Sequence, residues 1–473
     1  MTFAERITRL SKFDRVVGIV SLGLVGLILL TVLLGDRVGV LVYRAGPLGE
    51  GARSTSRILM EFSEPMQRDS VEPLFSTEPE LEGSVSWSGN TFVFQPSQPI
   101  PPGTDIRVSL ARGAVAQSGR VVLSEYRFDF SVRVPRVAFL YPANGTPQNI
   151  WVADTANPGN ATQLTFSPSG IYDFAVSPDG SQIVFAENNS NNGTRDLKLL
   201  TLETGALEQI TNCLDASCNT PVWRPDGAQI AYERVELNSD LAEQGIGSSP
   251  TRIWTLDLTS RPVQTRPLFS DLQLLGHSPQ YSANGERIAM YDTGMGAILI
   301  NDLTDGSLTA IPTRSGTSGA LSPDGTRLAY TEIVLADNAG AYSYLRLANL
   351  DNNDVTNISD PPQEIDDQRA VWRPDGRVMA IARRDQSINR GYQIYILDPL
   401  TQEIQQITTD NRYTNMFFAY DPTGRYLAVH RFPELDEFGQ PNMNGLPEIW
   451  MLDTETLQMT MLAENGFLPR WMP

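Results

Sequence analysis

One short pattern, two apolar runs separated by a Pro-Asp-Gly turn, recurs along the C-terminal part of this 473-residue chain. Glycine supplies the positive φ that a tight hairpin needs, and proline presets the bend before it. Each copy therefore predicts two antiparallel strands, and regular recurrence predicts a repeat architecture. The copies read AVSPDGSQIVFAE from Ala175, VWRPDGAQIAYER from Val222, QYSANGERIAMYD from Gln280, ALSPDGTRLAYTE from Ala320, VWRPDGRVMAIAR from Val371 and AYDPTGRYLAVHR from Ala419.

Each copy is followed by a third apolar strand, such as IWTLDLT from Ile253, and by a shorter fourth one, such as LEQIT from Leu207. Four antiparallel strands in a mean period of about 49 residues predict the blade of a β-propeller. Residues 135–473 resemble the TolB-type β-propeller, whose repeats carry the same apolar-PDG-apolar core. The resemblance implies a protein partner within the cell envelope.

The two ends of this stretch bear on the number of blades. VAFLYP from Val137, NIWVADT from Asn149 and ATQLT from Ala161 read as the last three strands of a blade, and LPRWMP from Leu468 matches a first strand. Joined, they would form a composite blade and close the ring without an exposed edge. We therefore expect seven blades. TolB-type propellers commonly have six, which is the alternative if the N-terminal strands only extend another blade.

Residues 54–134 alternate short β-rich runs with Gly and Pro turns, which predicts a β-sandwich. The phrases FSEPM from Phe62, GNTFVFQP from Gly89, PPGTDIRVSL from Pro101 and YRFDF from Tyr126 resemble a bacterial Ig-like domain. Such domains usually serve as spacers, and residues 36–53 are expected to be a linker. The whole chain is thus expected to be all-β apart from its N-terminal segment.

Residues 16–35 form an uncharged apolar run, long enough to cross a bilayer as one helix. Arg6, Arg9, Lys12 and Arg15 precede it, so residues 1–15 are expected to stay cytoplasmic and the rest of the chain to lie outside the cell membrane. The alternative is a cleaved signal peptide, but the run is longer than usual and no small-x-small cleavage site follows it.

The formal net charge is −19, which argues against a nucleic-acid partner. Cys213 and Cys218 lie five residues apart and could form a disulfide in an oxidising compartment; the alternative is a pair of unbonded thiols. Only two histidines are present, and neither a G-x-S-x-G elbow nor a phosphate-binding glycine loop occurs. We therefore expect no catalytic residue, no metal ligand set and no cofactor.

In a propeller, the PDG turns share one face and the longer joins share the other. Function more often resides in such loops. Acidic residues on the loop-rich face are the candidate partner site: Asp215, Glu236, Asp240, Asp360, Glu364, Asp366, Asp367, Glu434, Asp436 and Glu437. They favour a basic protein or a divalent cation such as Ca²⁺, although no calcium-binding motif supports the cation. The alternative is a solvated acidic surface. Tyr413 and Phe417, in a neighbouring crossing, could be exposed anchors, but Phe417 is expected to pack in the core.

Trp223 and Trp372 recur at equivalent blade positions, as packing between blades requires, and are expected to be structural. The turn aspartates are expected to bond their own backbone. The sequence thus predicts a membrane-anchored, outward-facing scaffold that recognises a protein of the envelope without catalysis. The alternatives are an envelope hydrolase or lyase acting on polysaccharide or peptide, and a carbohydrate- or metal-binding module.

Overall fold

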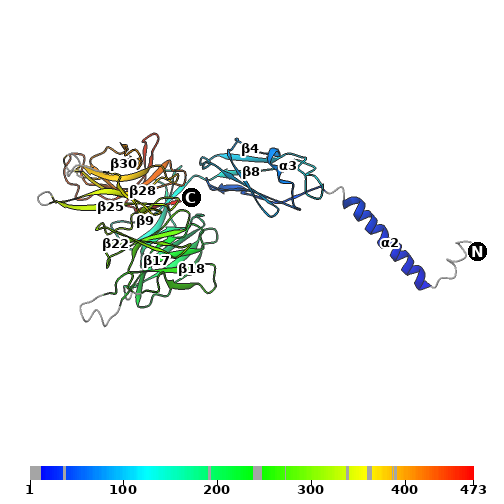
Figure 1. The fold of residues 1–473 in the computed structure, drawn as a ribbon, viewed down its shortest axis with the longest axis horizontal. Coiled ribbons are helices and arrows are strands. Elements are labelled where there is room, and N and C mark those ends of the chain that lie inside the picture. Colours follow the sequence, from blue (N-terminus) through cyan, green and yellow to red (C-terminus); the bar gives the residue numbers. More distant parts are fainter. Residues whose placement is uncertain are drawn as a thin grey trace, which may run out of the picture. The chain divides into compact units, whose positions relative to one another are not determined.

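The computed structural model describes residues 12–35, 39–189, 193–237, 248–271, 273–336, 340–359, 365–385, 387 and 391–473. The chain divides into two compact units, Met1–Arg133 and Val134–Pro473 (Figure 1). The division falls one residue before the expected start of the propeller at 135.

Helix α2 (Lys12–Gly35) contains the whole apolar run of the N-terminal segment. Its described side chains, at positions 13 and 16–30, are all exposed. Among the described residues, no helix has both the length and the hydropathy that crossing a bilayer requires. The membrane anchor stays a prediction.

The first unit contains two four-stranded sheets that enclose one hydrophobic core. The sheets have the orders β1 (Val42–Gly46), β3 (Ile58–Phe62), β6 (Thr91–Pro96), β5 (Gly83–Ser88) and β2 (Gly49–Ala52), β8 (Tyr126–Val132), β7 (Asp105–Leu110), β4 (Phe75–Glu78). Two short helices, α3 (Arg68–Val71) and η1 (Glu72–Leu74), lie between β3 and β4. In β3, Ile58, Met60 and Phe62 are buried and alternate with exposed residues, as a strand with one face on a core requires.

The expected linker at 36–53 is wrong for most of its described residues, because β1 and β2 belong to the sheets of this unit. Val40 and Ala52 are buried in the core, and the Val40 amide donates to the Val121 carbonyl oxygen at 2.9 Å. Gly46 belongs to β1 and Gly49 and Gly51 belong to β2, so only Pro47 and Leu48 lie between the two short strands. The Ig-like resemblance of the unit stays a prediction.

The second unit consists of antiparallel four-strand groups that follow one another along the chain, the arrangement of a β-propeller. The first groups are β12 (Ile171–Val176), β13 (Gln182–Asn188), β14 (Arg195–Thr201), β15 (Ala206–Gln209); and β16 (Ala216–Trp223), β17 (Gln229–Glu236), β18 (Arg252–Asp257), β19 (Gln264–Pro267). A parallel bridge between Arg195 and Ser217 joins these two groups into one sheet.

The later groups repeat the same order of strands. They are β20 (His277–Tyr281), β21 (Arg287–Asp292), β22 (Ala297–Asp302), β23 (Leu308–Pro312); β24 (Ala320–Leu321), β25 (Arg327–Ala336), β26 (Gly340–Asn349), β27 (Val355–Asn357); β28 (Ile365–Trp372), β29 (Met379–Asp385), β30 (Gln393–Leu397), β31 (Ile404–Gln406); and β32 (Tyr413–Tyr420), β33 (Tyr426–Pro433), β34 (Glu448–Asp453), β35 (Met459–Glu464).

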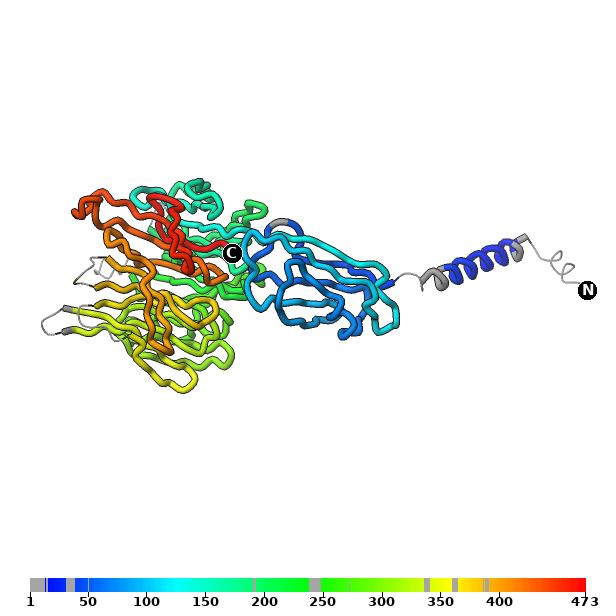
Figure 2. Tube along the Cα trace, turned by 90° about the horizontal axis from the view of Figure 1, so that it is seen from above, coloured from blue at the N-terminus to red at the C-terminus, as the bar shows by residue number. Residues whose placement is uncertain are grey.

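The last strand closes the unit. β36 (Phe467–Met472) pairs antiparallel with β9 (Arg136–Tyr141) in a sheet that β10 (Asn149–Asp154) and β11 (Ala161–Gln163) complete. Figure 2 shows the red C-terminal segment beside the cyan start of the unit. The first strands β12, β16, β20, β24, β28, β32 and β36 lie side by side in this order, and β36 lies beside β12.

Tryptophan side chains tie neighbouring first strands together. The indole N–H groups of Trp223, Trp372 and Trp471 donate to the carbonyl oxygens of Ala175, Ala320 and Ala419, at 3.2, 2.9 and 2.8 Å. Each bond joins one four-strand group to the group before it, so the expected structural role of Trp223 and Trp372 is confirmed. Trp471, on the closing strand, makes the same contact.

The PDG turns also bond as the sequence predicts. The carboxylates of Asp179, Asp226, Asp324 and Asp375 each accept the backbone N–H two residues later, at 2.9–3.1 Å. Arginines link one turn to the next: Arg327 donates to the Gly376 carbonyl oxygen at 3.1 Å. These aspartates are turn formers, so the functional surface has to be sought among the longer joins.

Candidate functional site

The candidate acidic residues do not form one group in the structure. Asp240, Asp360 and Glu364 lie outside the described residues. The remaining seven fall into three places: the strand β28, the join around the two cysteines, and the join between β33 and β34. Each place gives its carboxylates a different environment.

The expectation that Asp366 and Asp367 are exposed loop residues is wrong. Both are buried residues of β28, with 4% and 0% of their surface exposed. The guanidinium of Arg383 binds the Asp367 carboxylate through two N–H groups, at 2.5 and 2.7 Å. β28 begins at Ile365, so Asp366 and Asp367 belong to a strand and not to a loop. A charge buried this deeply needs a fixed partner, and Asp367 has one.

Asp366 joins two neighbouring sheets. It accepts hydrogen bonds from the Ser343 amide at 2.9 Å and the Ser343 hydroxyl, both from β26. It also accepts from the Tyr392 hydroxyl at 2.5 Å and pairs with Arg384 at 2.9 Å. Burial and the adjacent carboxylate raise the pKa of the Tyr392 phenol. All these donors are internal, so neither Asp366 nor Asp367 is available to a partner.

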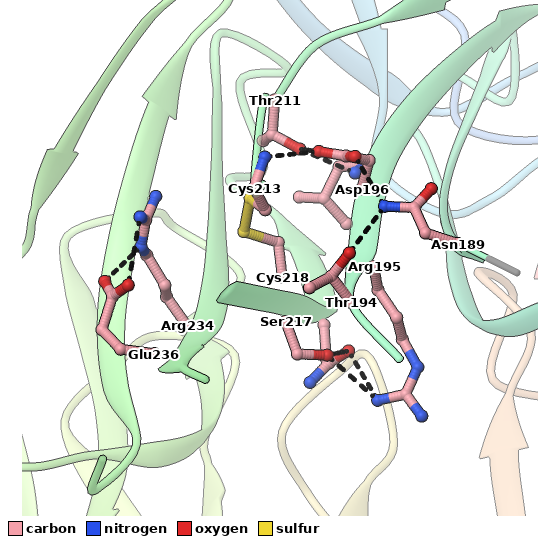
Figure 3. The surroundings of a disulfide bond; sticks show 12 residues. Asn189, Thr194, Arg195, Asp196, Thr211, Cys213, Ser217, Cys218, Arg234 and Glu236 are labelled. Atoms are coloured by element: carbon pink, nitrogen blue, oxygen red, sulfur yellow. Dashed lines mark hydrogen bonds and ion pairs between the residues drawn. A yellow bond between two sulfur atoms is a disulfide. The ribbon is translucent and has the colours of Figure 1, made fainter. Parts of the chain in front are cut away.

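Cys213 and Cys218 form a disulfide whose Cα atoms are 6.4 Å apart, and both side chains are fully buried (Figure 3). The buried Asp196 carboxylate holds the preceding segment. It accepts the Cys213 amide at 2.7 Å, the Thr211 hydroxyl at 3.1 Å and the Asn189 amide group at 3.0 Å. The disulfide loop is therefore fixed at its base.

The structure does bring Asp215 and Glu236 together. Asp215 is exposed in the disulfide loop, and its carbonyl oxygen accepts the Leu237 amide at 2.7 Å. Glu236 ends the neighbouring strand β17, where its carboxylate accepts the Arg234 Nε–H at 2.7 Å. Because this ion pair neutralises Glu236, Asp215 supplies most of the negative charge here.

Residues 433–447, called the recognition hairpin below, form an ordered insertion between β33 and β34. Leu435 and Pro441 pair as an isolated antiparallel bridge. The Asp436 carboxylate accepts the amides of Phe438 and Gln440 at 2.9 and 2.8 Å. The predicted partner residue Asp436 thus stabilises the turn with both bonds.

The recognition hairpin carries large apolar side chains in water. Phe438 is 78% and Met443 90% exposed. Glu437 is exposed beside Phe438, and Glu434 is half-buried at the base, where its amide donates to the Arg412 carbonyl oxygen at 2.8 Å. The acidic residues of this insertion were predicted as a site from the sequence, but Phe438 and Met443 were not. The available signal was the presence of apolar residues in a Gly- and Pro-rich insertion.

The expectation that Phe417 packs in the core is wrong. Its side chain lies on β32 and is 43% exposed. Its position coincides with a register shift between Asn415 and Phe417, which turns the side chain away from the regular alternation. Its ring stacks on that of His430, with 5.8 Å between the centroids.

Among the described residues, no three His, Cys, Asp or Glu side chains gather in a way that could hold a metal ion. What the described part of the loop-rich side offers is an apolar hairpin with acidic neighbours and a fixed disulfide loop.

No family model matches the chain, and no curated protein matches it either. Among solved structures, it is similar to TolB from Acinetobacter baumannii, with 15% identity and a TM-score of 0.42, over 85% of this chain and 83% of that one. Oligogalacturonate lyase from Vibrio parahaemolyticus has 13% identity and a TM-score of 0.43, over 77% and 87%. The periplasmic gluconolactonase of Pseudomonas aeruginosa has 14% identity and a TM-score of 0.46, over 71% and 98%.

Proposed function

We propose that this chain is a non-catalytic recognition scaffold, a closed ring of seven blades that binds a protein of the cell envelope through the recognition hairpin. The observation that carries the proposal is an ordered turn that holds Phe438 and Met443 out in water. Exposed apolar groups on a rigid support are what a partner's pocket can bury at low entropic cost. The buried acids Asp366 and Asp367 have no part in this surface.

The chemistry of the hairpin defines the partner. Aromatic side chains and methionine are enriched in the buried centre of protein interfaces, and a polar rim surrounds it. Here the rim would be Glu434 and Glu437. The fitting partner has an apolar socket with basic residues around it, and charge complementarity would steer the encounter.

The proposed location is the outer side of the cell membrane, with α2 as a single-pass anchor. The support is the exposure of its apolar side chains, among them Leu22 at 75% and Ile19 at 72%. An apolar surface of this kind is costly in water and stable in lipid. In a membrane fraction washed with alkaline carbonate, the full chain should stay with the membrane. In intact cells, protease added from outside should digest it. Release into the wash would contradict the anchor.

The test of the proposed function places a photo-crosslinking amino acid at Phe438 of the full chain in cells of its source. The matched control carries it at Leu400, which is equally exposed at 80%. Leu400 follows β30, in a join between third and fourth strands, so it lies on the side of the PDG turns. We expect one discrete crosslinked protein from position 438 and none from position 400.

A double variant of the acidic rim distinguishes specific recognition from nonspecific apolar association. The pair Glu434→Gln and Glu437→Gln should weaken the crosslink at 438, because it removes the charged rim and leaves the fold unchanged. The proposal is overturned if both positions capture the same proteins, or if position 438 captures nothing in cells where the protein is folded.

A further inference from the structure

Four first strands of the ring share an unusual backbone position. Thr220, Ser278, Arg369 and Leu468 all have positive φ, between 44° and 54°, and each lies three residues before the Trp or Tyr near the end of its strand. This conformation is strained for residues other than glycine. Because Thr, Ser and Leu adopt it equally well, the fold does not require an arginine there.

The charge of Arg369 is poorly compensated. Its Nε is buried and has no hydrogen-bond partner, and one N–H at Nη2 reaches the Phe418 carbonyl oxygen at 3.5 Å. No carboxylate pairs with it among the residues that the structure describes. Burial, and after it the positive charge of Arg470, lower the pKa of Arg369 to about 10. A half-buried cation without a counter-ion, whose Nε–H is out of water and has no acceptor, is costly, so its presence calls for a reason.

The neighbours of Arg369 come from the next first strands of the ring. Its guanidinium lies 4.9 Å from the centroid of the half-exposed Phe417 ring on β32. Arg470, on β36, is 3.9 Å from Asp173 on β12. Arg470 also departs from the repeat, because the equivalent positions hold Val222 and Val371.

The local charge is positive in a strongly acidic chain. Arg369 and Arg470 contribute two positive charges and Asp173 one negative charge. His430 adds none at neutral pH, because burial and Arg369 lower its pKa to about 4. The buried Nε2 of His430 also has no hydrogen-bond partner. One positive charge thus remains without compensation among the described groups.

We propose that Arg369 and Arg470 bind the carboxylate group of a small molecule whose planar or apolar body packs on Phe417. A guanidinium offers two parallel N–H donors that match a carboxylate. One net positive charge suits a monovalent carboxylate better than a doubly charged phosphate. The site is separate from the recognition hairpin and does not depend on the function proposed for it.

The test uses the purified full chain and measures binding by titration calorimetry. The probes are benzoate, benzamide as its uncharged counterpart, and inorganic phosphate, at constant ionic strength. We expect benzoate to bind at millimolar or lower concentration, benzamide not to bind, and phosphate to bind more weakly than benzoate. Tighter binding of phosphate would overturn the assignment to a carboxylate.

The decisive variant is Arg369→Ser, which installs the residue that β20 carries at the equivalent position. Losing charge-assisted hydrogen bonds should weaken benzoate binding about tenfold to hundredfold. Without ligand, this variant should melt no lower than the parent, because it removes a half-buried charge that no carboxylate compensates. Arg266→Ser, an exposed position on β19, is the matched control and should change neither quantity.

The proposal is overturned if benzoate does not bind the parent, or binds Arg369→Ser equally well. It is also overturned if Arg369→Ser melts well below the parent, since Arg369 would then serve the fold.

Discussion

At the scale of single residues, the repeat uses the same polar contacts several times over. The hydroxyls of Thr165, Thr211 and Thr408 each accept a backbone amide from the third strand and donate to a side chain that precedes this amide. Each of these threonines ends a phrase such as QLT or QIT. Burial of a hydroxyl is tolerated because both its donor and its acceptor are satisfied.

The indole bonds between first strands can be tested by Trp372→Phe. The change removes the 2.9 Å hydrogen bond from the indole to the Ala320 carbonyl oxygen, which costs about 0.5–1.5 kcal/mol. Urea unfolding should show this loss. Trp254→Phe is the control, because the Trp254 indole donates no hydrogen bond among the described residues. Equal losses for both variants would mean that ring volume, and not the hydrogen bond, carries the effect.

His430 should make stability depend on pH. Its pKa is lowered from an ordinary value near 6.5 to about 4, chiefly by burial. Between these values the unfolded chain binds more protons than the folded one, so stability is complete above about pH 6.5 and falls as the pH decreases toward 4. The loss is on the order of 3 kcal/mol.

His430→Gln should remove this part of the pH dependence, and His277→Gln should leave it. Urea unfolding of the three proteins at about pH 7 and about pH 4.5 measures the difference. An unchanged slope in His430→Gln would contradict the burial of a neutral imidazole.

At the scale of elements, the positions of strands could be predicted from the sequence better than the exposure of the acidic side chains. Strand positions follow from alternating apolar residues and from turn chemistry, which are local. Whether a carboxylate is exposed depends on what another strand places beside it. Arg383 and Arg384 pair with the carboxylates of Asp367 and Asp366, and Tyr392 donates a hydrogen bond to Asp366. These three residues lie 16 to 26 residues away along the chain. The positive φ of Arg369 could not be predicted from a local sequence pattern either.

The disulfide loop is an element whose contribution can be measured. In the chain-entropy view, closing so short a loop stabilises the fold by about 2 kcal/mol. The double variant Cys213→Ser and Cys218→Ser should therefore unfold at lower urea concentration by that amount. Reduction of the parent should give the same shift. If neither treatment changes the midpoint, the hydrogen bonds to Asp196 suffice to hold the segment.

At the scale of the whole molecule, the composite sheet explains how the chain avoids an exposed edge. The sequence indicated this from the likeness of the last residues to a first strand. It could not show the register, in which Phe467 lies opposite Leu140 and Trp471 opposite Val137. The start of the first unit was misplaced, because β1 and β2 are too short to give an apolar pattern of their own.

The proposed recognition surface depends on this closure, because open ends would leave the joins of the ring without a fixed geometry. The most direct test is the thermal unfolding of a chain that ends at Gly466, compared with the full chain and with Trp471→Ala. If β36 closes the ring, the shortened chain loses the cooperative transition of the second unit, and Trp471→Ala lowers the midpoint of that transition. A shortened chain that unfolds with the cooperativity and midpoint of the full one would contradict a ring closed by β36.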